Sequence, residues 1–165
     1  MADEVRDAAR RDGALQGAVV ADAVALPVEF GNASTLDTHG TGWIIGYSPW
    51  TISGDHALRH MPGERSARGV SVKWFDHPAG DPAGPRKPIS IGRSMSILVG
   101  PESEFRLEFS RFEDFPAAAT IAHTLRRTGD FVIWGDGVYH RAFGIRPASI
   151  MTVRWEPVAA PATAD

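Results

Sequence analysis

The middle of the chain alternates short runs of β-branched and aromatic residues with clusters of glycine and proline. Runs of this length, separated by turn residues at regular spacing, are typical of antiparallel sandwiches and barrels. Sustained helical periodicity is lacking there, although 115–125 has room for one helical turn. We predict strands over residues 43–47, 70–75, 89–99, 104–109, 120–126, 130–134, 138–143 and 149–155.

The two ends of the chain differ from this middle. Residues 3–12 are rich in Ala, Arg and Asp and predict a short exposed helix. An irregular stretch follows, with room for a strand near 24–30, and the Ala- and Pro-rich end is typical of a disordered tail. The expected organisation is an N-terminal helix and arm (1–41), one all-β barrel (42–157) and a tail (158–165).

Composition and charge exclude several kinds of chemistry and partner. The sequence of 165 residues has no cysteine, which rules out disulfides and thiolate-ligated metals. A net charge of −3 without a clustered basic face argues against nucleic-acid and anionic-membrane partners. No run approaches the roughly 20 apolar residues of a membrane span, and the acidic N-terminus is unlike a secretory signal. We expect a cytoplasmic protein.

One segment, Gly129–His140, carries the clearest site signal. The strand 130–134 is followed by Gly-Asp-Gly, which favours a hairpin turn, and His140 shares a face with Val138. The spacing resembles the second motif of the cupin superfamily, which is Gly, five residues, Pro-x-Gly, two residues and His. Gly135 stands at the position of the family's Pro. The resemblance implies a jelly-roll-like cupin barrel, with His140 as a site residue rather than a structural histidine that bonds a carbonyl.

The first cupin motif is matched only in part. After Gly69, Phe75 replaces the first histidine of the motif, His77 keeps the second, and Asp81 stands at the glutamate position. The resemblance covers about half of the chain, from 69 to 155, and is nearest to a group of uncharacterised bacterial cupin-like proteins. Some of these carry a signal-peptidase label, which finds no support in a sequence without a membrane anchor or Ser/Lys dyad. The group brings a fold and no established reaction.

The resemblance implies a metal site made of His77, Asp81 and His140. Two imidazoles and one carboxylate form the facial triad that holds Fe(II), and the same set accommodates Mn, Ni or Zn. The imidazole missing at Phe75 weakens such a site, so metal occupancy stays open. His77 can equally be an ordinary loop residue, and Asp81, beside Pro and Gly, is an ordinary turn residue unless His77 is a ligand. No organic cofactor is expected.

Two opposite orientations are open for the strand around Lys73. Hydrophobicity favours Val70, Val72 and Trp74 facing inward, whereas the motif spacing turns Lys73 inward, together with Phe75 and His77. A lysine inside a barrel is costly unless it is paired, so an inward Lys73 would bind an anionic substrate or a carboxylate. The outward Val and Trp side chains would then suit a homodimer interface.

Three functions follow from these residues. The first is a metal-dependent oxygenase or isomerase/lyase acting on a small molecule, with Lys73 and His140 as catalytic residues. Substrate would contact Lys73, Phe75 and Arg154, the last of which is otherwise a surface residue. The second function is a metal-free ligand-binding or accessory cupin. The third is a metal-free isomerase that uses a histidine as general base.

Overall fold

The computed structural model describes residues 25–36, 38, 40, 42–45, 68–80 and 87–156. This part of the chain forms eight strands and one short 3-10 turn, Ala117–Ala119. In chain order the strands are β1 (Val28–Asn32), β2 (Arg68–His77), β3 (Arg93–Leu98), β4 (Phe105–Ser110), β5 (Thr120–Leu125), β6 (Asp130–Trp134), β7 (Tyr139–Gly144) and β8 (Ala148–Glu156).

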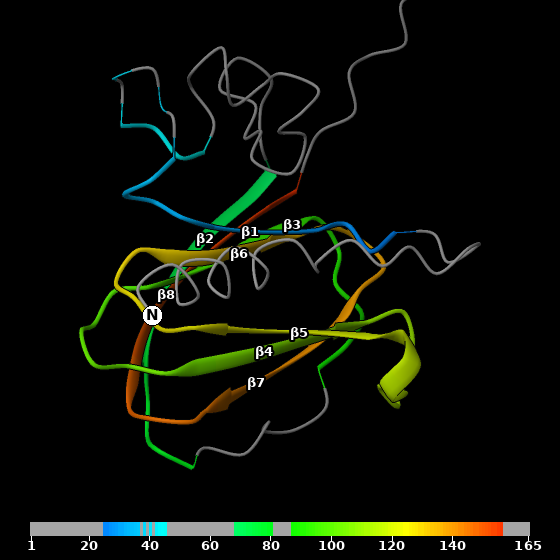
Figure 1. Cartoon of the computed structure of the whole chain (residues 1–165). Helices are drawn as coiled ribbons and strands as arrows, with labels where there is room; N and C mark the ends of the chain where they lie inside the picture. Colours follow the sequence, from blue (N-terminus) through cyan, green and yellow to red (C-terminus); the bar gives the residue numbers. More distant parts are fainter. Residues whose placement is uncertain are drawn as a thin grey trace, which may run out of the picture.

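The strands form two antiparallel sheets, one above the other in Figure 1. The larger sheet has the order β1-β6-β3-β8-β2, and the smaller has the order β5-β4-β7. Successive strands such as β6, β7 and β8 alternate between the two sheets, so the chain wraps a common interior. The all-β class and the jelly-roll-like barrel expected from the sequence are confirmed.

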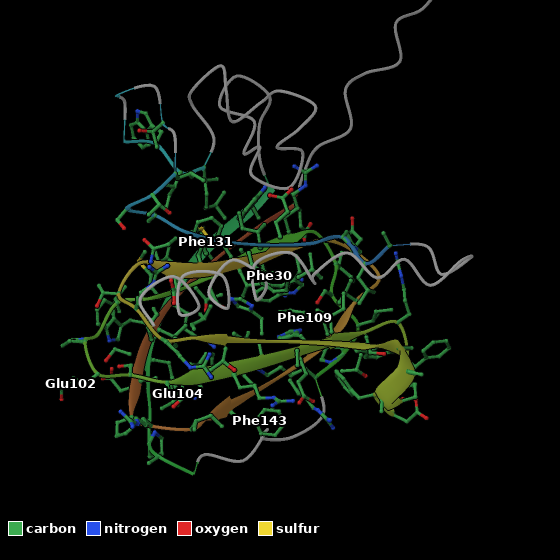
Figure 2. All side chains as sticks on the ribbon, in the orientation of Figure 1. Phe30, Glu102, Glu104, Phe109, Phe131 and Phe143 are labelled. Carbon is green, nitrogen blue, oxygen red and sulfur yellow. The ribbon has the colours of Figure 1, made fainter. Side chains whose placement is uncertain are left out.

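The interior between the sheets holds the main hydrophobic core. Phe109 of β4 points into it, and Phe30 of β1 packs against it, as Figure 2 shows. A second cluster covers the opposite face of the larger sheet, where Phe131 and Trp155 are fully buried. Because successive side chains of a strand alternate between its faces, β6 carries apolar side chains on both faces of the larger sheet.

Two strand predictions are wrong. Residues 43–45 of the expected strand 43–47 are irregular, and the rest of that strand lies outside the described residues. The expected strand 89–99 is divided at Gly92, whose positive φ of 76° ends the extended run before β3 begins at Arg93. The strand near 24–30 exists as β1, whereas the helix over 3–12 and the tail after Pro157 lie outside the described residues.

The helical content is very small. The one helical turn that the sequence allowed within 115–125 is the 3-10 turn Ala117–Ala119, which leads directly into β5. Within the described ranges, no helix has the length and apolar character that a bilayer span requires.

Candidate functional site

The hairpin between β6 and β7 positions His140. Gly129 and Gly137 have positive φ angles of 89° and 70°, a conformation that glycine adopts without strain. The Gly129 N–H donates to the Leu98 carbonyl at 2.8 Å, and Val138 is fully buried. His140 pairs with Phe109 of β4, so its side chain faces the barrel interior.

A short hydrogen-bond chain holds the His140 ring. The Trp134 indole N–H donates to Ser90 Oγ at 3.1 Å, and Ser90 Oγ lies 3.3 Å from His140 Nδ1. Ser90 belongs to the irregular segment 87–91, which lies beside the hairpin. Its N–H donates to the Val138 carbonyl at 2.9 Å, and its carbonyl accepts from the Gly137 N–H at 3.0 Å. Ser90 is therefore a positioning residue for His140.

The environment of His140 disfavours its charged form. Burial, followed by the positive charges of Lys87, Lys73 and Arg154, lowers the pKa of His140 to about 3. The imidazole is therefore neutral at neutral pH. Three cations within electrostatic reach of one buried ring mark this end of the barrel as strongly positive.

The strand β2 adopts the orientation that turns Lys73 toward the interior. Lys73 and His77 line the cavity between the sheets, whereas Val70, Val72 and Trp74 point away from it, with exposed fractions of 50%, 66% and 59%. Hydrophobicity alone would have given the opposite result. The motif spacing gave the correct face of the strand.

The barrel interior opens into a cavity of about 390 Å³, a size that suits a small-molecule ligand. Side chains from six strands and from the segment 87–91 surround it. The lining residues are Ser71, Lys73, His77, Lys87, Pro88, Ile89, Ser90, Ile91, Ser94, Ser96, Phe105, Leu107, Trp134, His140, Ala142, Ile150, Thr152 and Arg154.

One half of the cavity is polar. On the inner face of the larger sheet, Arg154 of β8 pairs with Ser71 on one side and with Ser94 on the other. The next inward row places Thr152 between Lys73 and Ser96, and the hydroxyls of Thr152 and Ser96 lie 2.9 Å apart. Hydroxyls on a sheet face that would otherwise be core indicate a surface built for a polar ligand.

The other half of the cavity is apolar. Ile150 lies two residues beyond Thr152 along β8, and Phe105, Leu107 and Ala142 face it from the smaller sheet. All four side chains are buried. The cavity therefore changes from charged to apolar along the strand direction, between Arg154 and Ile150, which are four positions or roughly 13 Å apart.

The charged side chains among the described lining residues are all basic. Both lysines of the chain, Lys73 and Lys87, line the cavity, although the other fifteen basic side chains of the sequence are arginines. Arg154 is a third cation in the lining, and no described Asp or Glu lines it. This concentration of positive charge occurs in a chain with a net charge of −3.

Some of the predicted site residues line the cavity and others do not. Lys73, His77, His140 and Arg154 line one cavity. Phe75 is half-exposed and contacts the His77 ring at 4.7 Å instead of lining the cavity, and Asp81 lies outside the described residues.

The two candidate histidines lie toward different ends of the cavity. The His77 ring packs on Phe105, with 4.5 Å between the ring centroids, whereas His140 pairs with Phe109. Phe105 and Phe109 are four residues apart on β4, roughly 13 Å along the strand. Within the described ranges no group of three or more His, Asp or Glu side chains is arranged to hold a metal ion.

Two important site residues, Lys87 and Ser90, were not predicted from the sequence. Both belong to the irregular segment beside the hairpin, and long-range backbone hydrogen bonds to Val138 and Gly137 fix its position. A signal was present: the only other lysine of the sequence besides Lys73 stands at 87, at the end of the Pro- and Gly-rich loop.

Comparison with known proteins assigns no family to this chain. No protein-family model and no curated protein matches the sequence. The structure is similar to Streptomyces albus HEPD with 2-hydroxyethylphosphonate and Fe(II) bound (14% identity, TM-score 0.45, 58% of this chain and 20% of that one). It is also similar to the hydroxypropylphosphonic acid epoxidase of S. wedmorenis in complex with fosfomycin (15%, 0.40, 61% and 60%).

A third similar structure is the WlaRB TDP-quinovose 3,4-ketoisomerase of Campylobacter jejuni (6% identity, TM-score 0.36, 56% of this chain and 65% of that one). This chain thus spans between one fifth and two thirds of the length of these proteins. Identities and TM-scores this low assign no activity to the chain.

Proposed function

We propose that this protein binds a small organic anion in the cavity of its barrel. The observation that carries the proposal is the convergence of Lys73, Lys87 and Arg154 on a cavity that no described carboxylate lines. Buried hydroxyls of Ser94 and Ser96 add hydrogen-bonding groups to the same half of the cavity. Cationic groups and hydroxyl donors in a partly buried site are the ordinary means of holding carboxylate, phosphate or sulfate groups.

The described residues do not fit a resident divalent metal ion. The donor set of the cavity is two imidazoles, which lie toward opposite ends, and His140 already has three cations around it. A divalent cation next to His140 would add to that positive charge, with no described carboxylate to offset it. A metal site that includes Asp81 stays a prediction, and no step of the proposed function depends on a metal.

A second candidate function is proton transfer on the bound anion, with His140 as the general base. The hydrogen bond between Ser90 Oγ and His140 Nδ1 favours it, because it fixes the ring and leaves Nε2 as the other ring nitrogen for a ligand. A bound anion would offset the three nearby positive charges and raise the pKa of the His140 ring.

The two lysines permit a direct binding experiment. Reductive methylation with carbon-13 formaldehyde keeps the charge of lysine and labels only Lys73, Lys87 and the α-amino group. We expect both lysine resonances to shift on titration with phosphate, sulfate or a short carboxylate. Lys73→Arg and Lys87→Arg variants assign the two resonances.

Matched variants test where the anion binds. Lys73→Gln or Arg154→Gln should weaken anion affinity about 5- to 30-fold, because each removes one partly exposed charge-assisted contact. Arg126→Gln, which removes an arginine paired with Glu104 away from the cavity, should leave affinity unchanged. Equal effects of all three substitutions would contradict the proposal.

The metal arm of the experiment uses the same protein. We expect anion affinity to survive dialysis against EDTA, with less than stoichiometric transition metal by elemental analysis before dialysis. Loss of anion binding on chelation, restored by Fe(II), Mn, Ni or Zn, would instead support the metal-dependent function. If the protein turns over a bound anion, and this activity survives EDTA but is lost in His140→Gln, the result would support proton transfer.

A further inference from the structure

The cavity has two chemically different halves, and an inorganic anion would occupy only one of them. The charged half contains Lys73 and Arg154, whereas the lining changes to Phe105, Leu107 and Ile150 at the other end. Phosphate or sulfate at the cations would leave this buried apolar half without a partner. An apolar surface inside a ligand cavity contributes to binding only when apolar atoms of the ligand cover it.

One lining strand of each sheet shows this gradient, so it is not confined to a single strand. On the larger sheet the inward side chains of β8 run from Arg154 through Thr152 to Ile150. On the smaller sheet the inward side chains of β7 run from His140 to Ala142. Within the larger sheet, Arg154 and Thr152 pair with Ser or Lys residues, whereas Ile150 pairs with Phe75 and Leu98.

We infer that the ligand is an amphiphilic organic anion, whose charged group lies among Lys73, Lys87 and Arg154 and whose apolar body lies against Phe105, Leu107 and Ile150. This inference rests on the proposed function and adds the class and the orientation of the ligand. It is distinct from a sugar or a polyol, for which the apolar half offers few hydrogen-bonding groups. His77, which packs against Phe105, lies at the end of the cavity that the apolar body would reach.

A homologous ligand series tests the inference on the unmodified protein. Inorganic phosphate serves as the charged group alone, and methyl, butyl and hexyl phosphate extend it with an apolar chain of increasing length. Each methylene that enters the apolar half should lower Kd about fourfold, until that half is full and the affinity levels off. The straight-chain carboxylates from acetate to octanoate show whether the same dependence holds for a singly charged head.

A variant locates the apolar body. Ala142→Leu fills space at the apolar end and should abolish the gain from butyl to hexyl phosphate, while the affinity for inorganic phosphate stays within about twofold. Ala118→Leu, on the exposed 3-10 turn, adds the same atoms outside the cavity and should leave the whole series unchanged.

The outcomes separate the two proposals. If every phosphate binds with the same Kd whatever its chain length, the anion site stands and the amphiphilic ligand is overturned. If the gain with chain length is the same in the Ala142→Leu variant, the assigned position of the apolar body is overturned. If neither phosphate nor any ester binds, the proposed function itself fails, and the inference fails with it.

Discussion

Removal of the Ser90 hydroxyl should loosen a side-chain link between the loop segment 87–91 and the barrel interior. Ser90 Oγ accepts a hydrogen bond from the Trp134 indole at 3.1 Å and lies 3.3 Å from His140 Nδ1. Ser90→Ala keeps the two backbone hydrogen bonds of this residue to the hairpin. The substitution therefore tests the side-chain link alone.

The expected loss of stability follows from the burial of the two partners. Trp134 is 2% exposed, so its indole N–H would have little access to water after the hydroxyl is gone. A buried donor left without a partner costs about 1–3 kcal/mol, and His140 can recover part of its lost contact from water in the cavity. We expect a decrease of about 1–2 kcal/mol in the free energy of unfolding, or roughly 3–8 °C in Tm.

Urea and thermal unfolding, followed by far-ultraviolet circular dichroism, measure this change. Ser90→Thr, which keeps the hydroxyl, should stay closer to the wild-type stability than Ser90→Ala. Ser94→Ala removes another hydroxyl of the same cavity and serves as the matched control. If Ser90→Ala and Ser94→Ala lower the free energy of unfolding equally, the link through Ser90 has no special role in holding His140.

Two further predictions concern stability. Burial by itself raises the pKa of Asp130, but hydrogen bonds from Asn32 and two backbone N–H groups outweigh it and lower the pKa. The carboxylate therefore stabilises the fold above its unfolded pKa of about 4, and this contribution is lost as the pH falls through the lower folded pKa. In urea unfolding, Asp130→Asn should be less stable than wild type at pH 7. The difference in free energy of unfolding between the two proteins should close below a pH of about 4. A constant gap from pH 7 to 3 would contradict the assignment. Gly92→Ala should destabilise far more than Gly40→Ala, because both glycines have a φ of 76° but only at Gly92 would a Cβ approach the Trp155 carbonyl, at 2.5 Å; equal Tm losses would refute this.

The sequence was informative where local pattern and fold agree. The strands β6 and β7 of the hairpin begin and end within a residue or two of the predicted bounds. Gly129 marks the turn before β6 and Gly137 marks the turn between the two strands, and both are visible in the sequence. The inward face of β2 was also predictable, although only from the resemblance. Its outward Val and Trp side chains look like core to any argument from hydrophobicity.

The sequence was misleading where long-range contacts decide the structure. The run from Ile89 to Val99 looks like one strand, but the backbone turns at Gly92 and its first part pairs with the hairpin through Val138. The roles of Lys87 and Ser90 depend on that pairing, which no local pattern contains. The graded lining of the cavity likewise results from the register of the paired strands and cannot be predicted from any one of them.

The position of β8 in the chain has a consequence for how the cavity forms. This strand lies between β2 and β3 and supplies Arg154, Thr152 and Ile150, yet it is the last strand of the described residues. Its pairing with β2 joins segments about 80 residues apart, a contact of the kind that slows folding. During synthesis the larger sheet lacks an inner strand until residue 156 has left the ribosome. Ligand binding can therefore stabilise only a chain that already includes β8, and no shorter nascent chain can present the complete cavity.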